Sequence, residues 1–197
     1  MALSTPQRRR RPWYAGWMDD SRFVADVMLG RLARWLRALG YDTLYFRDAP
    51  DRRLLAVALA DRRRLLTRDV VLARRARDAG LLVRAEVLDA QIQEVTAACG
   101  LTGRQALSRC LECNALLTVA PRETVRDRVP PYTFATQREF WTCTGCSRVF
   151  WTGTHVAGIR RRLEPYLQDP RDRPGPETPT GDGLTAATLH SRGVGLQ

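Results

Sequence analysis

Lysine and long apolar runs are both absent from this chain of 197 residues. All 32 basic residues are arginine, which indicates a compositional bias that replaces lysine with arginine. No apolar run approaches the roughly 20 residues that a membrane-spanning helix needs. The basic start, MALSTPQRRRRPWYAGWMDD, has no apolar region behind it, so we expect neither a secretory signal nor membrane association, and we expect a cytoplasmic protein.

The remaining composition is that of a globular, strongly basic protein. Apolar residues make up 44% of the chain, which is enough for a proper core, and the formal net charge is +11. The arginine bias does not remove this excess of positive over negative charge. The charge therefore favours a polyanionic partner such as nucleic acid.

Polar segments frame the chain at both ends. We expect residues 1–21 to be a disordered basic extension, because they are arginine-rich and show no period. We expect residues 168–197 to be a disordered tail, because QDPRDRPGPETPTGDG is rich in proline and glycine. The middle divides into residues 22–103 and residues 104–167.

Residues 22–103 alternate short apolar runs with helical patterns. Strands are expected at 22–26, 41–46, 65–67 and 81–83, and helices after residue 26 and at 51–63, 70–79 and 88–99. In the first helix the apolar positions follow one face and Gly40 supplies the stop: Leu29, Leu32, Ala33, Leu36 and Leu39. This order predicts an α/β fold with a parallel sheet that is flanked by helices on both faces.

Acidic residues follow each of the expected strands. They are Asp26 after the first strand, Asp48 and Asp51 after the second, Asp69 after the third, and Glu86 and Asp89 after the fourth. Because ligand sites of such sheets lie at the carboxyl ends of the strands, these side chains are expected at one edge. Clustered carboxylates repel one another unless a cation neutralises them, and oxygen ligands suit Mg²⁺ or Mn²⁺. One or two such ions could activate a water for attack on a phosphodiester.

Each carboxylate also has a plainer interpretation. Asp51 and Asp89 precede helices and can be ordinary N-caps, as Asp69 can. Asp26 is harder to explain in this way, because it lies inside the apolar stretch FVADVML. An unpaired carboxylate would cost several kcal/mol to bury there. Asp48 and Glu86 are weaker candidates.

Four of the five cysteines form two C-x₂-C pairs, CLEC and CTGC. Their spacing matches a structural Zn²⁺ site with four thiolate ligands: Cys110, Cys113, Cys143 and Cys146. Asn114, directly after the first pair, is suited to the left-handed conformation that such a turn often needs. Cys99 stands alone on a helical period and is expected in the core.

Aromatic and arginine residues surround these cysteines. They include Arg148 and Trp151, and rings and guanidinium groups of this kind can stack bases and hold phosphates of single-stranded RNA. The alternative is that a small metal domain uses the aromatics as its own core. His155, nine residues beyond Cys146, is a candidate zinc ligand, phosphate contact or general acid, or a plain surface residue.

The motifs resemble a known family. Over about residues 22–156 the chain is similar to the PIN-like RNases of the Mut-seven C-terminal domain family. The likeness lies in six motifs, in this order: FVADVMLGRLARWLRALGYDT, LLTRDVVLARRA, SRCLECN, RVPPY, FWTCTGC and VFWTGTH. The resemblance implies a PIN-type α/β nuclease core in 22–103, divalent-metal RNA cleavage, and a zinc-ribbon segment in 104–167. It matches Asp26 to the first acidic ligand, Asp69 to a later one and Asp51 to the acid that opens the second helix. The match of Asp89 to a fourth is loose.

We therefore predict a metal-dependent ribonuclease. Asp26, Asp51, Asp69 and Asp89 are the predicted catalytic acids, with Asp26 and Asp69 holding Mg²⁺ or Mn²⁺, and Zn²⁺ is structural. Predicted contacts to single-stranded RNA are Arg31, Arg68, Arg148, Trp151 and His155. Two alternatives remain. One is a non-catalytic nucleic-acid-binding protein whose acids only cap helices, and the other is the toxin of a toxin–antitoxin pair.

Overall fold

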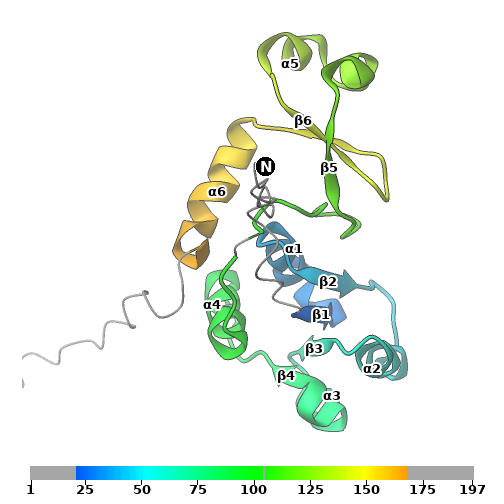
Figure 1. Cartoon of the computed structure of the whole chain (residues 1–197). Coiled ribbons are helices and arrows are strands. Elements are labelled where there is room, and N and C mark those ends of the chain that lie inside the picture. Colours follow the sequence, from blue (N-terminus) through cyan, green and yellow to red (C-terminus); the bar gives the residue numbers. More distant parts are fainter. Residues whose placement is uncertain (1–20, 104, 168–197) are drawn as a thin grey trace, which may run out of the picture.

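The computed structural model describes residues 21–103 and 105–167. The two segments expected to be disordered lie outside these residues, apart from Ser21. The described chain forms a parallel four-stranded sheet with helices, followed by a three-stranded antiparallel sheet and a final helix (Figure 1). The predicted α/β class with a parallel sheet flanked by helices is therefore confirmed.

The parallel sheet has the strand order β2-β1-β3-β4. Its strands are β1 (Arg22–Ala25), β2 (Asp42–Tyr45), β3 (Arg64–Thr67) and β4 (Gly80–Leu82). The chain runs from β1 to β2 on one side, then crosses to β3 on the other side of β1. Such a change of direction creates a topological switch point between β1 and β3.

The two faces of the sheet carry different helices, because successive side chains of a strand point to opposite faces. Phe23 and Leu66 belong to a core with α1 (Gly30–Ala38) and α4 (Leu88–Cys99). Val24 and Leu65 pack instead with α2 (Asp51–Ala60) and α3 (Val70–Ala76). The expectation of a sheet covered on both faces is confirmed.

Several helices are shorter than the sequence pattern indicates. A 3₁₀ turn, η1 (Val27–Leu29), separates β1 from α1, and a second one, η2 (Arg77–Ala79), follows α3. Helix α2 ends at Ala60 rather than residue 63, because Arg62 adopts a left-handed conformation (φ 51°). This turn directs Arg63 back to the carboxylate of Asp42, with Nη1–Oδ1 at 2.7 Å.

The cysteine-rich segment, residues 105–153, contains the antiparallel sheet. Its strands are β5 (Leu117–Ala120), β6 (Phe140–Cys143) and β7 (Val149–Trp151), in that order. The 3₁₀ helix η3 (Arg122–Arg128) and the short helix α5 (Pro131–Thr136) lie between β5 and β6. A small apolar cluster of Ala120, Val125, Val129 and Phe140 holds the segment together.

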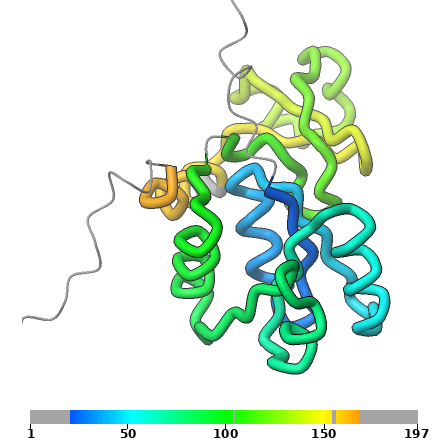
Figure 2. Tube along the Cα trace, turned by 60° about the horizontal axis from the view of Figure 1, so that its bottom comes forward, coloured from blue at the N-terminus to red at the C-terminus, as the bar shows by residue number. Residues whose placement is uncertain are grey.

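Helix α6 (Thr154–Leu167) returns from the antiparallel sheet to the α/β part, where it lies beside α4 (Figure 2). Its Leu163 and Tyr166 are buried in the same core as α1 and α4. Pro165 lies near its end. Across residues 21–103 and 105–167, no helix combines the length and apolar character needed to cross a bilayer.

Candidate functional site

Two of the predicted acids lie at the switch point of the parallel sheet. Asp26 directly follows β1, and Asp69 follows β3 with one residue, Arg68, in between. These two strands are neighbours in the sheet. Both acids therefore lie beyond the carboxyl ends of adjacent strands. This is where parallel α/β sheets bind their ligands.

The Asp26 carboxylate is buried, with 7% of the residue exposed. Its Oδ1 accepts a hydrogen bond from the Val27 N–H at 2.6 Å, and its Oδ2 accepts one from the Thr67 hydroxyl at 2.7 Å. Asp26 thus caps η1, so the plainer interpretation is correct in part. An ionised carboxylate offers about four acceptor positions, so two donors leave capacity for a cation.

Thr67 joins this carboxylate to the second acid. Its hydroxyl donates to Asp26 and accepts the backbone N–H of Asp69 at 3.0 Å. The Asp69 side chain caps α3, because its Oδ1 accepts from the N–H groups of Val71 and Leu72 at 2.6 and 3.0 Å. Asp69 itself is exposed, whereas Thr67 is fully buried. A buried threonine therefore sets the relative position of the two loops.

Three of the other acidic candidates have arginine partners. Asp51 begins α2 and pairs with Arg75 of α3, Oδ2–Nη1 3.7 Å. Asp89 lies in the first turn of α4 and accepts from the Nε of Arg162 at 2.8 Å, which ties α4 to α6. Glu86 pairs with Arg68 at 3.5 Å and is exposed, as Asp48 is. Asp89 thus serves a helix–helix contact in this structure.

The spacing of these acids decides whether they form a ready-made metal cluster. Within the described residues, the cysteines are the one group of three or more metal-binding side chains whose ligand atoms all lie within 4.8 Å. A smaller set is still chemically adequate: Mg²⁺ is commonly held by one or two carboxylates together with waters and substrate phosphates. Asp26 and Asp69 could supply these carboxylates.

The four cysteine sulfurs fit a tetrahedral ion. Cys110 and Cys146 have their Sγ atoms 3.7 Å apart, and Cys113 and Cys143 have theirs 3.2 Å apart. A tetrahedron with Zn–S bonds of about 2.3 Å has S–S edges of about 3.8 Å, so small shifts complete the site. The residue after each pair, Asn114 or Ser147, adopts a left-handed conformation (φ 72° and 57°), as predicted for Asn114.

The pKa of one of these thiols, Cys143, is lowered, which favours the thiolate form that binds metal. Burial raises the pKa of Cys143, but hydrogen bonds from the Cys146 N–H, the Cys113 thiol and the Gly145 N–H together outweigh this and lower the pKa to about 7. The two N–H groups lie 3.4 and 3.3 Å from its sulfur. Desolvation raises the pKa of Cys113 to about 12, and its hydrogen bond to Cys143 acts in the same direction. Cys99, predicted in the core, packs against the main apolar cluster and does not belong to this group.

Two polar residues fasten the first cysteine loop to the α/β part. The buried guanidinium of Arg37 in α1 donates to the carbonyls of Thr43, Leu111 and Glu112 at 2.8–2.9 Å. Burial lowers the pKa of Arg37, while the neighbouring Cys110 and Cys113 oppose this. A zinc ion with four thiolates would carry two negative charges, so the Arg37 cation complements it. Asn114 accepts from the Thr43 N–H at 3.0 Å and donates to Asp42 at 2.7 Å.

The predicted RNA-contacting residues come from different parts of the fold. Arg31 is exposed on the first turn of α1, close in sequence to Asp26, and Arg68 lies beside Asp69. Arg148 is 61% exposed and approaches Glu112 at 3.9 Å. Trp151 packs against the apolar cluster around Phe140, so it serves the core of the cysteine-rich segment. His155 lies in α6, and its side chain is outside the part that the structure describes.

Three residues acquire importance only in the folded chain. They are Thr67 between the two acids, Trp35 on α1 and Glu112 in the first cysteine loop. The TRD motif was a signal for Thr67, because a hydroxyl two residues before a helix-capping aspartate can hold its N–H. Trp35 and Glu112 gave no sequence signal, since their partners are distant along the chain.

A family model described as the Mut7-C RNAse domain matches residues 21–163, which covers both the parallel sheet and all four clustered cysteines. Neither a curated protein nor a solved structure matches the chain.

Proposed function

Because the chain belongs to the Mut7-C RNAse domain family, we propose that it hydrolyses phosphodiester bonds of RNA with the help of Mg²⁺ or Mn²⁺. The observation that carries this proposal is the Asp26–Thr67–Asp69 arrangement at the switch point of the sheet. A buried carboxylate with unused acceptor capacity beside a second acid is a site of the kind that divalent ions occupy. The PIN-type relationship rests on the sequence resemblance.

Asp26 and Asp69 would hold the ion in this proposal. The ion would supply Lewis-acid stabilisation of the charge that develops on the phosphate, and would make a water more acidic. The chain's own contribution is to orient the two carboxylates through Thr67. Arg31 and Arg68, near the two acids in sequence, would attract the RNA backbone. Asp51 and Asp89 as further catalytic acids stay predictions, and Asp89 would first have to leave Arg162.

The surroundings of the acids suit a nucleic acid more than a free phosphate. Exposed apolar side chains lie at the starts of the helical turns that follow β1, β3 and β4: Val27, Met28, Val70, Val71 and Val87. Apolar side chains near the carboxylates can lie against sugars and bases while arginines contact phosphates. We propose single-stranded RNA as the substrate, because its bases are free to make such contacts.

We propose that the four cysteines hold one structural Zn²⁺. The ion would fix the two cysteine loops of the antiparallel sheet, and through Arg37 and Asn114 it would fix them to the α/β part. Paired thiols that serve a metal indicate a reducing compartment, in keeping with the predicted cytoplasmic location. Domain bounds of 22–103 and 104–167 stay part of this proposal.

The test is cleavage of labelled single-stranded RNA by the purified chain. We expect cleavage with Mn²⁺ or Mg²⁺ and none after chelation, with recovery when Mn²⁺ alone is added back. Zinc content is measured throughout, because a chelator can also strip the cysteines. Asp26→Asn should lower the rate by about 100-fold or more, in the range seen when an electrostatic catalytic group is removed. The matched control is Asp78→Asn, an exposed carboxylate beside β4 at the opposite edge.

A second function is favoured by one observation. Asp26 and Asp69 both cap helices. In a protein that only binds nucleic acid, helix capping alone would explain why both residues are there. Salt-dependent RNA binding with no cleavage under any divalent ion would identify this function. Equal cleavage rates in wild type and Asp26→Asn would also contradict the proposal, because Asp26 would then have no role in cleavage.

A further inference from the structure

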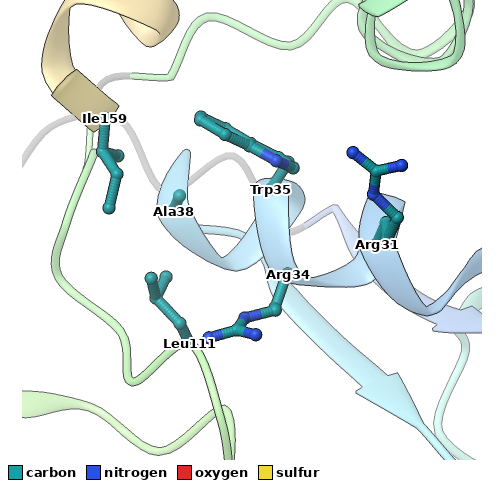
Figure 3. A pocket seen from close by; sticks show the side chains of 6 residues that line it. All are labelled: Arg31, Arg34, Trp35, Ala38, Leu111 and Ile159. Carbon is teal, nitrogen blue, oxygen red and sulfur yellow. The ribbon is translucent and has the colours of Figure 1, made fainter. Parts of the chain in front are cut away.

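A pocket of about 280 Å³ lies between α1, α6 and the first cysteine loop (Figure 3). Its lining is Arg31, Arg34, Trp35, Ala38, Leu111 and Ile159. Figure 3 shows Arg34 extending toward Leu111, while Trp35 and Ile159 lie at the other side of the pocket. The pocket therefore joins the α/β part to the segment that carries the cysteines. Of these residues, only Arg31 also has a role in the proposed acidic site, where it would attract the RNA backbone.

Helix α1 connects this pocket to Asp26. Asp26 caps the turn that leads into α1, so the first residues of the helix lie nearest to the acids. Arg31, Trp35 and Ala38 follow at positions i, i+4 and i+7 and share one face of the helix. The distance along the helix from Arg31 to Ala38 is about 10 Å, from a rise of 1.5 Å per residue. A single strand of RNA that runs from the acids along this face of α1 would reach the pocket within a few nucleotides.

The charge along this path complements a polyanion. Arg31 makes no ion pair with any described residue. Arg34 and Arg148 share one carboxylate, that of Glu112. The net charge of these four side chains is therefore +2, and it extends from the start of α1 to the cysteine-rich segment. We name Arg31, Arg34 and Arg148 the basic strip.

The pocket itself suits a flat apolar group. Trp35 is half-buried and packs against the main core, which holds its ring in place. The guanidinium of Arg162 lies 4.9 Å from the centre of this ring, and Arg162 is itself held by Asp89. Arg162 does not line the pocket. A ligand in the pocket would therefore contact a part of the Trp35 ring that the Arg162 guanidinium does not cover. Leu111 and Ile159 supply the remaining apolar walls.

We propose that this pocket is a base-binding subsite, in which Trp35 contacts a base of single-stranded RNA while the basic strip holds the neighbouring phosphates. The proposal rests on the proposed ribonuclease function for the direction of the strand, but its chemistry requires RNA binding alone. An aromatic platform beside arginines is the general means of holding single-stranded nucleic acid without sequence readout. The subsite would hold the RNA beyond the acidic site.

The test measures RNA affinity in the zinc-loaded full chain carrying Asp26→Asn, so that cleavage does not interfere. We expect Trp35→Ala to weaken binding of a short single-stranded RNA by about 10-fold or more, and Trp35→Phe to retain most of the affinity. Arg31→Ala should weaken binding and lower the slope of log affinity against log salt by about 0.7, because one phosphate contact is lost. Trp35→Ala should leave that slope unchanged.

Arg52→Ala is the matched control, because Arg52 is an exposed arginine on α2, away from the strip. Circular dichroism shows whether each variant is folded. If Trp35→Ala does not fold, Arg31→Ala still tests the proposal. Wild-type affinity in folded Trp35→Ala, or an Arg31→Ala effect no larger than that of Arg52→Ala, would overturn the subsite and leave the pocket to a protein partner. Lack of cleavage by wild type, with Trp35 still required for binding, would refute the nuclease and support the subsite.

Discussion

Replacement of Thr67 by valine tests the link between the two acids most directly. Valine has nearly the shape of threonine and suits a strand, but it has no hydroxyl. The variant removes the donor to Asp26 and the acceptor for the Asp69 N–H, while the backbone of β3 can stay unchanged. We expect a loss of both stability and activity.

The magnitude follows from the two lost hydrogen bonds. A hydrogen bond to a charged group contributes about 1.5–3 kcal/mol, and a polar group left unsatisfied costs about 1–3 kcal/mol. Water can reach the exposed Asp69 loop and offset part of the second loss. We therefore expect the free energy of unfolding to fall by about 2–4 kcal/mol. For a chain of this size this lowers Tm by roughly 5–15 °C.

Two companion variants separate activity from stability. Thr67→Ser keeps the hydroxyl and loses a buried methyl group, so it should cost about 1 kcal/mol of stability and keep most of the cleavage rate. Thr43→Val, in β2, removes a hydroxyl that is just as buried and that donates to the Tyr41 carbonyl at 3.2 Å. It should lower Tm without changing the rate per folded molecule. Thermal denaturation and RNA cleavage are measured on all three.

Cleavage of RNA at the wild-type rate by Thr67→Val, at a temperature where it is folded, would contradict this prediction, since the position of Asp26 relative to Asp69 would then not depend on the hydroxyl. A rate loss of equal size in Thr43→Val would also contradict it, because general destabilisation would explain both variants.

Three further predictions concern the metal, pH and a turn. One zinc per chain is expected by elemental analysis, and Cys113→Ser should lose it and expose the segment to protease. Burial would raise the pKa of Asp42, but hydrogen bonds from Arg63 and Asn114 outweigh this and lower it. Asp42 therefore stabilises the fold above the unfolded pKa of about 3.9, and Asp42→Asn should be less stable at pH 7 with a deficit that shrinks under acid, measured by urea unfolding. Gly40→Ala should cost about 2 kcal/mol or more by thermal unfolding, because φ is 97° and the new Cβ would lie 2.3 Å from a carbonyl oxygen.

Much of the α/β order could be predicted because it depends on local periodicity. Helix α4 begins and ends at the expected residues 88 and 99, and its apolar positions leave one helical face to bury. Helix α2 shows the limit of this reasoning. Nothing near Arg63 indicates that it turns away to meet Asp42, which comes from a strand about twenty residues earlier.

The candidate site divides in the same way. That acids follow the strands could be seen in the sequence, but Asp26 and Asp69 become neighbours only because β1 and β3 pair in the sheet. Asp89 also comes after a strand of the parallel sheet, yet Arg162 of α6 holds it. Local sequence cannot decide between these outcomes, because each acid's partner comes from a distant segment.

The sequence by itself determined the alternation of strands and helices and the paired cysteines, since both are patterns over a few residues whose chemistry is local. Only the tertiary structure decided that a buried threonine joins two of the acids, that Arg37 and Asn114 fasten the cysteine loop to the sheet, and that Trp35 borders a pocket. Those contacts depend on strand order and on the docking of α6, which arise from burial of apolar surface summed over the whole chain.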